Sequence, residues 1–277
     1  MHPLLAIYAG LFFPDKGVSP NAQDIFELYV LIFVMALVVF IGVQGSLIWF
    51  LLKFKARRGR VAAQIHGNTR LEIGWTVGAA VVLVFITVVT FIKLPGIKDP
   101  AKSDIDAQGN TVAANALFAA TDQPAPPKGA TLHIVVDGQQ YVWRFQYPQQ
   151  GDKVVYSYEE MVVPVGMTVT LDITSDDVAH SWWVPALGGK ADAIPGYVNK
   201  SWFKVTKPGT YFGQCAELCG RNHANMYARV QAVPFNQYQA WYDRQAAAIK
   251  AARDAGAKQR AELNKQQQQP TQQTQTP

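Results

Sequence analysis

Two long apolar runs lie in the first third of the chain. Residues 25–52 are apolar apart from Glu27, Gln44 and Ser46, and residues 73–94 are apolar apart from threonines and Lys93. A helix needs about 20 apolar residues to cross a hydrocarbon core about 30 Å thick, whereas a buried helix of a soluble core usually has a shorter run and a polar face. The pattern predicts a transmembrane helix hairpin over residues 25–94, with an outer N-terminal segment over residues 1–24.

The pattern changes after the hairpin. Residues 95–129 have no sustained period and are rich in Pro and Gly, which predicts a connector. Short β-rich runs then follow over residues 130–235, bounded by Gly, Pro and Asp, and their spacing indicates an antiparallel sandwich or barrel. Residues 236–265 are rich in helix formers, with Asn236 as the expected N-cap, and the Gln-rich residues 266–277 are predicted to form a disordered tail. The predicted fold is therefore a membrane-anchored all-β protein.

The charges orient the hairpin. Its loop, residues 53–72, carries six Lys or Arg and one Glu, and short basic loops stay in the cytoplasm. Both chain ends and the β region then lie on the outer side. The net charge of +5 comes from this loop and from the residues after Trp241, so it does not indicate a nucleic-acid partner. The first residues lack a basic n-region and an A-x-A-like cleavage site, which favours an uncleaved segment.

The candidate chemistry lies in one loop of the β region. The segment GQCAELCGRNHANM places both cysteines of the chain, Cys215 and Cys219, close to His223 and Met226. His180 follows a β run in DDVAHSWW, where a second ligand can arrive from another strand. A structural disulfide suits an oxidising outer compartment, but it explains neither the histidines nor the methionine.

Two thiols, two imidazoles and a thioether form a soft ligand set that suits copper. A tetrahedral zinc site would use the two Cys and two His and leave Met226 unused, and a blue-copper site needs a single Cys. The economical solution is two copper ions bridged by both thiolates, each with one histidine, and with Met226 as a weak ligand on one side.

The two-span hairpin, the loop CAELCGRNHANM and the preceding DDVAHSWWVPALGGKADAIPG resemble subunit II of the haem–copper cytochrome c oxidases, from about Glu27 to Pro234. The resemblance implies a cupredoxin-like domain with a binuclear CuA centre that takes electrons from a cytochrome c and passes them to a haem in subunit I, where O₂ is reduced to water. It also implies Mg²⁺ shared with subunit I through the Glu217 side chain. The implied CuA ligands are His180, Cys215, Glu217 (backbone carbonyl), Cys219, His223 and Met226.

The resemblance also implies residues that serve partners. Glu72 matches the family glutamate that marks the start of a proton-uptake path, although it can equally be an interfacial charge. For electron input and docking it indicates Tyr141, Trp143, Asp176 and Asp177. The chain departs from the family here, because Tyr141 stands where the family has a tryptophan and Gln146 where it has a glutamate.

The expected partners are oxidase subunit I and other oxidase subunits, a soluble or membrane-bound cytochrome c, and membrane lipid, with no nucleic acid. The chain has no C-x-x-C-H motif, so haem is expected in the partner subunit, and this chain is not expected to reduce oxygen itself. The predicted location is the bacterial plasma membrane, with the CuA domain on the periplasmic side. Two alternatives are a quinol-oxidising relative, which loses the copper ligands, and a membrane-tethered copper chaperone.

Overall fold

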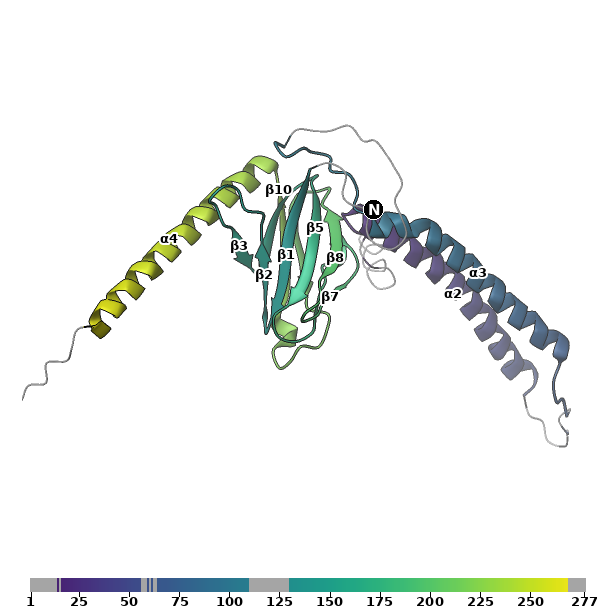
Figure 1. Cartoon of the computed structure of the whole chain (residues 1–277). Helices are drawn as coiled ribbons and strands as arrows, with labels where there is room; N and C mark the ends of the chain where they lie inside the picture. The colour runs from purple at the N-terminus through teal and green to yellow at the C-terminus, as the bar shows by residue number, and fades with distance from the viewer. Residues whose placement is uncertain are drawn as a thin grey trace, which may run out of the picture.

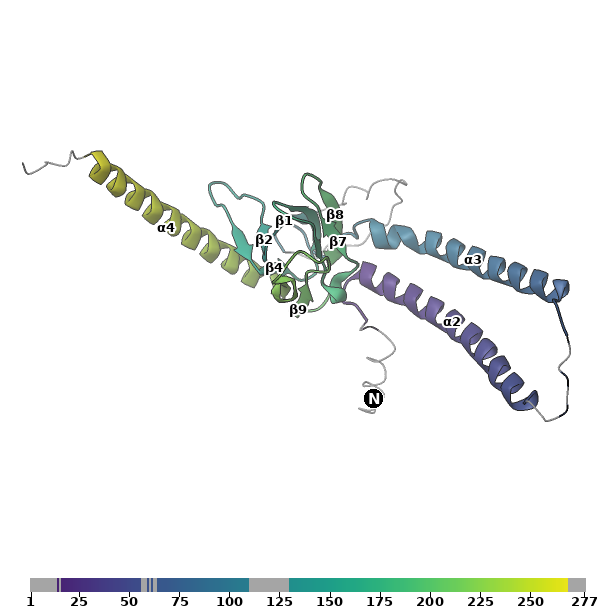
Figure 2. The same ribbon diagram turned by 90° about the horizontal axis from the view of Figure 1, so that it is seen from below.

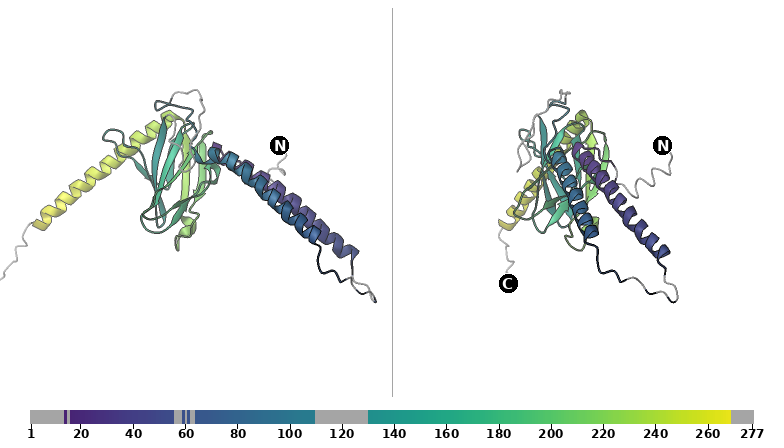
Figure 3. Two further views of the ribbon diagram at one scale, coloured as in Figure 1. Left: turned by 45° about the vertical axis from the view of Figure 1, so that its right-hand side comes forward. Right: turned by 90° about the vertical axis from the view of Figure 1, so that its right-hand side faces the viewer.

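The computed structural model describes residues 14, 16–55, 59, 61, 64–109 and 130–268. It consists of a long helix hairpin, a central β domain and a C-terminal helix (Figure 1). The hairpin and the C-terminal helix leave the β domain on opposite sides (Figures 2 and 3).

The hairpin is formed by helices α2 (Pro20–Lys53) and α3 (Thr69–Lys98), which both have the length and hydropathy of membrane spans. Their apolar side chains are exposed over most of the length, as expected for surfaces that face lipid. Asn68 caps α3 by accepting a hydrogen bond from the Leu71 amide. Both helices extend beyond the predicted apolar runs at their outer ends, where Lys93 donates to Asp24 at 2.9 Å and to Glu27 at 2.6 Å.

Three sheets form the β domain. The largest has the order β3-β2-β1-β5-β8, the second β4-β10-β9, and the smallest pairs β6 with β7. Their strands are β1 (Thr131–Gln139), β2 (Val142–Gln146), β3 (Tyr156–Tyr158), β4 (Glu160–Pro164), β5 (Thr168–Ser175), β6 (His180–Trp182), β7 (Ala191–Ala193), β8 (Asn199–Lys204), β9 (Gly209–Gln214) and β10 (Tyr227–Val233).

The prediction of a β domain is confirmed, but the prediction that it is antiparallel is wrong for two pairs. Strands β1 and β5 are parallel, and so are β4 and β10. The alternation of apolar side chains shows which face of a strand is buried, but it carries no information about strand direction. The buried core between the sheets includes Trp143, Phe145, Phe203, Ile134 and Met161.

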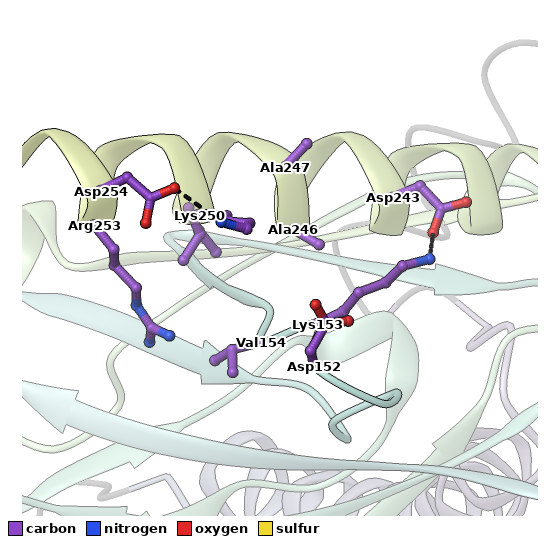
Figure 4. Close-up of a pocket in the computed structure, with 10 residues that line it drawn as sticks. Asp152, Lys153, Val154, Asp243, Ala246, Ala247, Lys250, Arg253 and Asp254 are labelled. Atoms are coloured by element: carbon purple, nitrogen blue, oxygen red, sulfur yellow. Dashed lines mark hydrogen bonds and ion pairs between the residues drawn. The ribbon is translucent and has the colours of Figure 1, made fainter.

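The C-terminal helix α4 (Phe235–Gln268) packs on the β domain through its first half only. Tyr238 and Tyr242 are buried, and the Tyr242 hydroxyl donates to the Pro148 carbonyl at 2.7 Å. On the adjacent loop, Lys153 reaches up to Asp243 at 2.9 Å (Figure 4).

Both ends of α4 differ from the sequence prediction. The Pro234 carbonyl accepts from the amides of Gln237 and Tyr238, so the helix begins before Asn236, which is not its N-cap. Residues 266–268 belong to the helix, although they were predicted as the start of a disordered tail, because glutamine is a good helix former. Residues 269–277 of the predicted tail lie outside the described residues.

A buried polar joint connects the hairpin to the β domain. Ser19 is hydrogen-bonded to Asn21 and accepts from the Lys204 amide at 3.0 Å. The Asn21 side-chain amide donates to the Trp202 carbonyl at 2.9 Å, and the Trp202 indole donates to the Ile97 carbonyl at 3.0 Å. Because the bonds reach both α2 and α3, the joint fixes the β domain on the end of the hairpin.

Candidate metal centre

The metal-ligand residues are brought together by the ends of three strands. Cys215 directly follows β9 and Met226 directly precedes β10, and the Cys215 amide donates to the Met226 carbonyl at 2.9 Å. Between them, His223 begins the short 3-10 helix η2 (His223–Asn225). The Ala216 amide donates to the Ser181 carbonyl at 2.9 Å, which brings β6, and therefore His180, against the same loop.

The ligand atoms form two sets of three, which we call the ligand cluster. In the first set, the Cys215 sulfur lies 3.8 Å from His180 Nδ1 and 3.2 Å from the Glu217 carbonyl oxygen. In the second, the Cys219 sulfur lies 3.6 Å from His223 Nδ1 and 3.9 Å from the Met226 sulfur. The two cysteine sulfurs are 3.9 Å apart and join the sets.

Four residues of the ligand cluster are shielded from water, whereas His223 is half-buried and Glu217 is exposed. His180 and Met226 are 0% exposed, and Cys215 and Cys219 are buried free thiols. Burial, together with the neighbouring Cys215 thiol, raises the pKa of Cys219 to about 11. This thiol therefore holds its proton at neutral pH, and a bound cation has to displace that proton to obtain a thiolate ligand.

Asp177 orients the buried histidine. Its carboxylate lies 2.9 Å from His180 Nε2 and also accepts from the amides of Gln140 at 2.7 Å and Val178 at 2.6 Å. Desolvation opposes ionisation of Asp177, but the bonds to His180 and the two amides outweigh it and lower its pKa to about 2. With Nε2 bound to a carboxylate, Nδ1 is the nitrogen left to face Cys215 and a metal.

This ligand set fits copper. Ligands bound to one metal at about 2.0–2.3 Å lie roughly 3–4 Å apart, which is the spacing within each set. His180, Cys215 and Cys219 present ligand atoms within 4.8 Å of one another. Each set contains one histidine and one weaker ligand, which is the Glu217 carbonyl or the Met226 thioether. If both copper ions share the two sulfurs, each ion also has two thiolate ligands.

Comparison with known proteins gives matches to both parts of the chain. Residues 6–92 match the family model "Cytochrome C oxidase subunit II, transmembrane domain" and residues 154–233 match "Cytochrome C oxidase subunit II, periplasmic domain". A probable cytochrome c oxidase subunit 2 from Rickettsia bellii is 31% identical over 241 residues, which cover 80% of each chain. The chain belongs to the cytochrome c oxidase subunit II family.

Further similar proteins are bacterial. Cytochrome c oxidase subunit 2 of Alkalihalophilus pseudofirmus is 34% identical over 83% of this chain, and the match spans only 61% of that longer relative. A crystal structure of the periplasmic domain of subunit II (CoxB) of Bradyrhizobium japonicum is 33% identical and covers 42% of this chain and 94% of that domain, at a TM-score of 0.40. The predictions of two transmembrane helices and a periplasmic β domain are thus confirmed.

Tyr141 lies against the subunit II ligand loop. A β-carbon added to Gly220 would lie 2.6 Å from the Tyr141 hydroxyl, and Gly220 has a φ of +138°, so this position favours glycine on both counts. The neighbouring Gln140 side chain donates to the Cys219 carbonyl at 2.5 Å. Tyr141 is half-buried and lies against Gly220, the residue that follows the ligand Cys219.

Trp143 does not provide a docking surface. It is 0% exposed in β2, and its ring meets the His180 ring edge-on at a centroid distance of 5.8 Å. An aromatic residue in a strand is equally compatible with either face, so sequence alone could not distinguish a docking tryptophan from one that packs behind a metal ligand.

The remaining predicted site residues are separate from the ligand cluster or at its edge. Asp176 is exposed and accepts from the Gln139 side chain at 2.6 Å. The Glu217 carboxylate is exposed, whereas its carbonyl faces Cys215. Glu72 lies in the first turn of α3, where it accepts from the Asn68 amide at 3.3 Å, a capping role that the sequence analysis missed.

Proposed function

We propose that this chain is the electron-input subunit of a respiratory cytochrome c oxidase. Its CuA centre accepts electrons from a cytochrome c and passes them to a haem in subunit I, where O₂ is reduced to water. The observation that carries this proposal is the division of the ligand cluster into two sets joined by the Cys215 and Cys219 sulfurs. When bound there, a copper pair supplies a reversible one-electron couple shared by two ions.

The residues of the chain would hold two coppers and limit their movement. Cys215 and Cys219 would bridge the ions as thiolates, with His180 and His223 as terminal imidazoles through Nδ1. Met226 and the Glu217 carbonyl would be the weaker ligands, one at each end. Burial of both cysteines, His180 and Met226 limits the access of water, and the backbone bond between Cys215 and Met226 holds the two ends of the loop at a fixed distance. A rigid set of ligands suits electron transfer, because oxidation and reduction then require little rearrangement.

Electron input is assigned to Tyr141, whose hydroxyl end lies against Gly220, one residue from the ligand Cys219. Asp176 is the exposed acid next to this position. Asp177, also predicted as a docking acid, is bonded to His180, so its main contribution would be to the metal ligand. Trp143 would support the same histidine from inside the domain.

Two further roles concern subunit I. The exposed Glu217 carboxylate would contribute one oxygen ligand to a shared Mg²⁺, and the other ligands would come from subunit I and water, because Mg²⁺ requires six. Glu72 would mark the cytoplasmic start of a proton path in subunit I, which is compatible with its exposed position at the start of α3.

Electron paramagnetic resonance of the full copper-loaded chain, together with a metal count, tests the proposed function. We expect two coppers per chain and hyperfine splitting shared equally between two copper nuclei. One copper with a single-nucleus signal would contradict the proposal and favour a copper chaperone. Binding of haem-containing subunits during purification provides an independent check, because a chaperone has no need of them.

A further inference from the structure

The turn between β1 and β2 contacts both sets of the ligand cluster. Gln140 and Tyr141 form this turn, at the same end of the β domain as the ligand loop (Figure 1). Gln140 is not a ligand of the proposed metal centre. It is nevertheless hydrogen-bonded in two directions, once through its main chain and once through its side chain, and the two bonds lead to different ligand sets.

The main-chain bond leads to the set that contains His180. The Gln140 amide donates to one carboxylate oxygen of Asp177 at 2.7 Å, and the other oxygen lies 2.9 Å from His180 Nε2. A carboxylate held at both oxygens cannot rotate freely, so the imidazole that it orients is also held. Outer partners of this kind fix the ring orientation of a metal-bound histidine.

The side-chain bond leads to the set that contains His223. The Gln140 amide group donates to the Cys219 carbonyl at 2.5 Å, which fixes the peptide between Cys219 and Gly220. The next carbonyl, that of Gly220, accepts from the His223 amide at 3.1 Å. Gln140 therefore holds the main chain from which both ligands of this set, the cysteine and the histidine, extend.

Two glycines allow the turn to approach the ligand cluster closely. A β-carbon added to Gly138, just before the turn, would lie 3.0 Å from His180 Cδ2. A β-carbon added to Gly220 would lie 2.8 Å from the Gln140 side-chain nitrogen. The Gly138 carbonyl also accepts from the Asp176 amide at 3.1 Å, which ties the turn to the segment before His180. The turn is thus packed against both sets without room to shift between them.

The two cysteines are held from different places. The Ala216 amide donates to the Ser181 carbonyl, which fixes the Cys215 side of the ligand loop on β6. Gln140 fixes the Cys219 side on the β1–β2 turn. Two coppers that share one electron equally require two ligand sets of matched strength, and this match depends on where each sulfur lies relative to both ions.

We infer that Gln140 is a positioning residue for the copper pair, an inference that rests on the proposed function. It holds the His180 set and the His223 set in one fixed relation, and its effect is on the geometry of the centre in the absence of any electron donor. Loss of its side-chain bond should let the Cys219 side move relative to the Cys215 side, so that the two coppers become inequivalent.

Electron paramagnetic resonance of the full copper-loaded chain in detergent tests this inference. Gln140→Ala removes the side-chain donor and keeps the main-chain bond to Asp177, and Gln140→Met also keeps the length of the side chain. In both variants we expect two coppers per chain, hyperfine splitting that is unequal between the two nuclei, and a shifted reduction potential. Chelator competition should show about 3–10-fold weaker copper binding, a smaller loss than for the partner of a ligand side chain, because Gln140 bonds to a main-chain carbonyl.

Gln139→Ala is the matched control, because the neighbouring Gln139 side chain donates to Asp176 at 2.6 Å instead of to the ligand loop. This variant should retain the wild-type spectrum and affinity. Equal effects of Q139A and Q140A, or a wild-type spectrum in Q140M, would overturn the inference. A merely structural role is also distinguished, since it would lower the unfolding free energy of Q140A and leave the splitting of the folded, loaded chain equal.

Hydrogen exchange of the copper-free chain separates this inference from the proposed function. Mass spectrometry of peptides that cover residues 213–226 should show amide exchange about 5-fold faster in Q140A than in wild type, and no change in Q139A. Equal exchange in wild type and Q140A would refute the positioning role. A single-copper signal in the wild-type chain, with the exchange difference intact, would refute the proposed function alone.

Discussion

The hairpin joint and the ligand cluster both contain buried groups able to bind through N, O or S, but they differ in the partners that these groups have. In the joint, Ser19, Asn21 and the Lys204 amide bond to one another and to the main chain. Within the described residues, the buried side-chain nitrogen and oxygen atoms that have no hydrogen-bond partner belong to Asp137, Trp143, Ser181 and Trp182, none of which is a predicted ligand or part of the joint. Three of these residues are neighbours of His180: the Trp143 ring contacts its ring, and Ser181 and Trp182 follow it in β6.

This difference separates a structural contact from a binding site. A joint is complete when its polar groups are paired, because an unpaired buried group costs about 1–3 kcal/mol. In the ligand cluster, five side chains and one carbonyl turn toward one another, yet the protein provides few hydrogens to share among them. Such an arrangement is explained by bound metal, because thiolate, imidazole, thioether and carbonyl groups are all metal ligands.

Replacing a bridging cysteine should break the ligand cluster completely. In Cys215→Ser or Cys219→Ser, one of the two sulfurs that join the sets is replaced by a harder oxygen, which is a poor copper ligand. We expect loss of the two-copper signal in electron paramagnetic resonance and at most one copper per chain by metal analysis. Two coppers with an unchanged spectrum in either variant would show that the thiolates do not bridge.

Removing the acceptor of His180 should weaken the site without removing a ligand. Asp177→Ala leaves Nε2 without its carboxylate, and loss of such a partner typically lowers metal affinity about 10–100-fold. Competition with a copper chelator measures this change. Asp176→Ala is the matched control, because Asp176 is the adjacent acid and bonds to Gln139, and it should change affinity less than 3-fold. Equal losses of copper affinity in the two variants would mean that Asp177 acts through its negative charge and not by orienting His180.

A change in the joint should affect stability and leave the metal centre intact. Asn21→Ala leaves the Trp202 carbonyl and the Ala22 amide without their partner, which should cost about 1–3 kcal/mol in unfolding free energy. Chemical denaturation in detergent measures this cost, with Asn264→Ala, an exposed position in α4, as control. A changed copper spectrum in Asn21→Ala would show that the two regions are not independent.

Met226→Leu should have the smallest structural effect. The swap conserves volume, so it should cost less than about 1.5 kcal/mol in stability, and both coppers should stay bound because the thioether is a weak ligand. We expect a shifted reduction potential in a spectroelectrochemical titration and slower electron transfer. Loss of copper would show that Met226 holds the metal instead of tuning it.

Sequence reasoning found the ligands because their chemistry is local. The loop GQCAELCGRNHANM contains Cys215, Cys219, His223 and Met226, and His180 follows a β run in the segment DDVAHSWW. The role of Asp177 was missed, because a carboxylate three residues before a histidine reads equally well as a solvated loop residue. Trp143, which is predicted for electron input and docking or as an ordinary strand aromatic, is fully buried, and its burial depends on which strands pair.

Long-range structure was the least accessible from sequence. The parallel pairing of β1 with β5 depends on how the connections cross, which the apolar pattern does not contain. The joint likewise unites Asn21 with Trp202, which are 181 residues apart in the chain. Neither residue has a composition or spacing that would single it out.

The joint affects the distance between the metal centre and its electron acceptor. Electron tunnelling slows steeply with each added ångström between redox centres, so a CuA domain that swung on a loose tether would deliver electrons at a variable rate. The bonds from Ser19, Asn21 and Trp202 to both helices fix the height and tilt of the β domain relative to the spans. The hairpin therefore anchors the β domain and also determines the distance between the ligand cluster and any electron acceptor buried in the membrane.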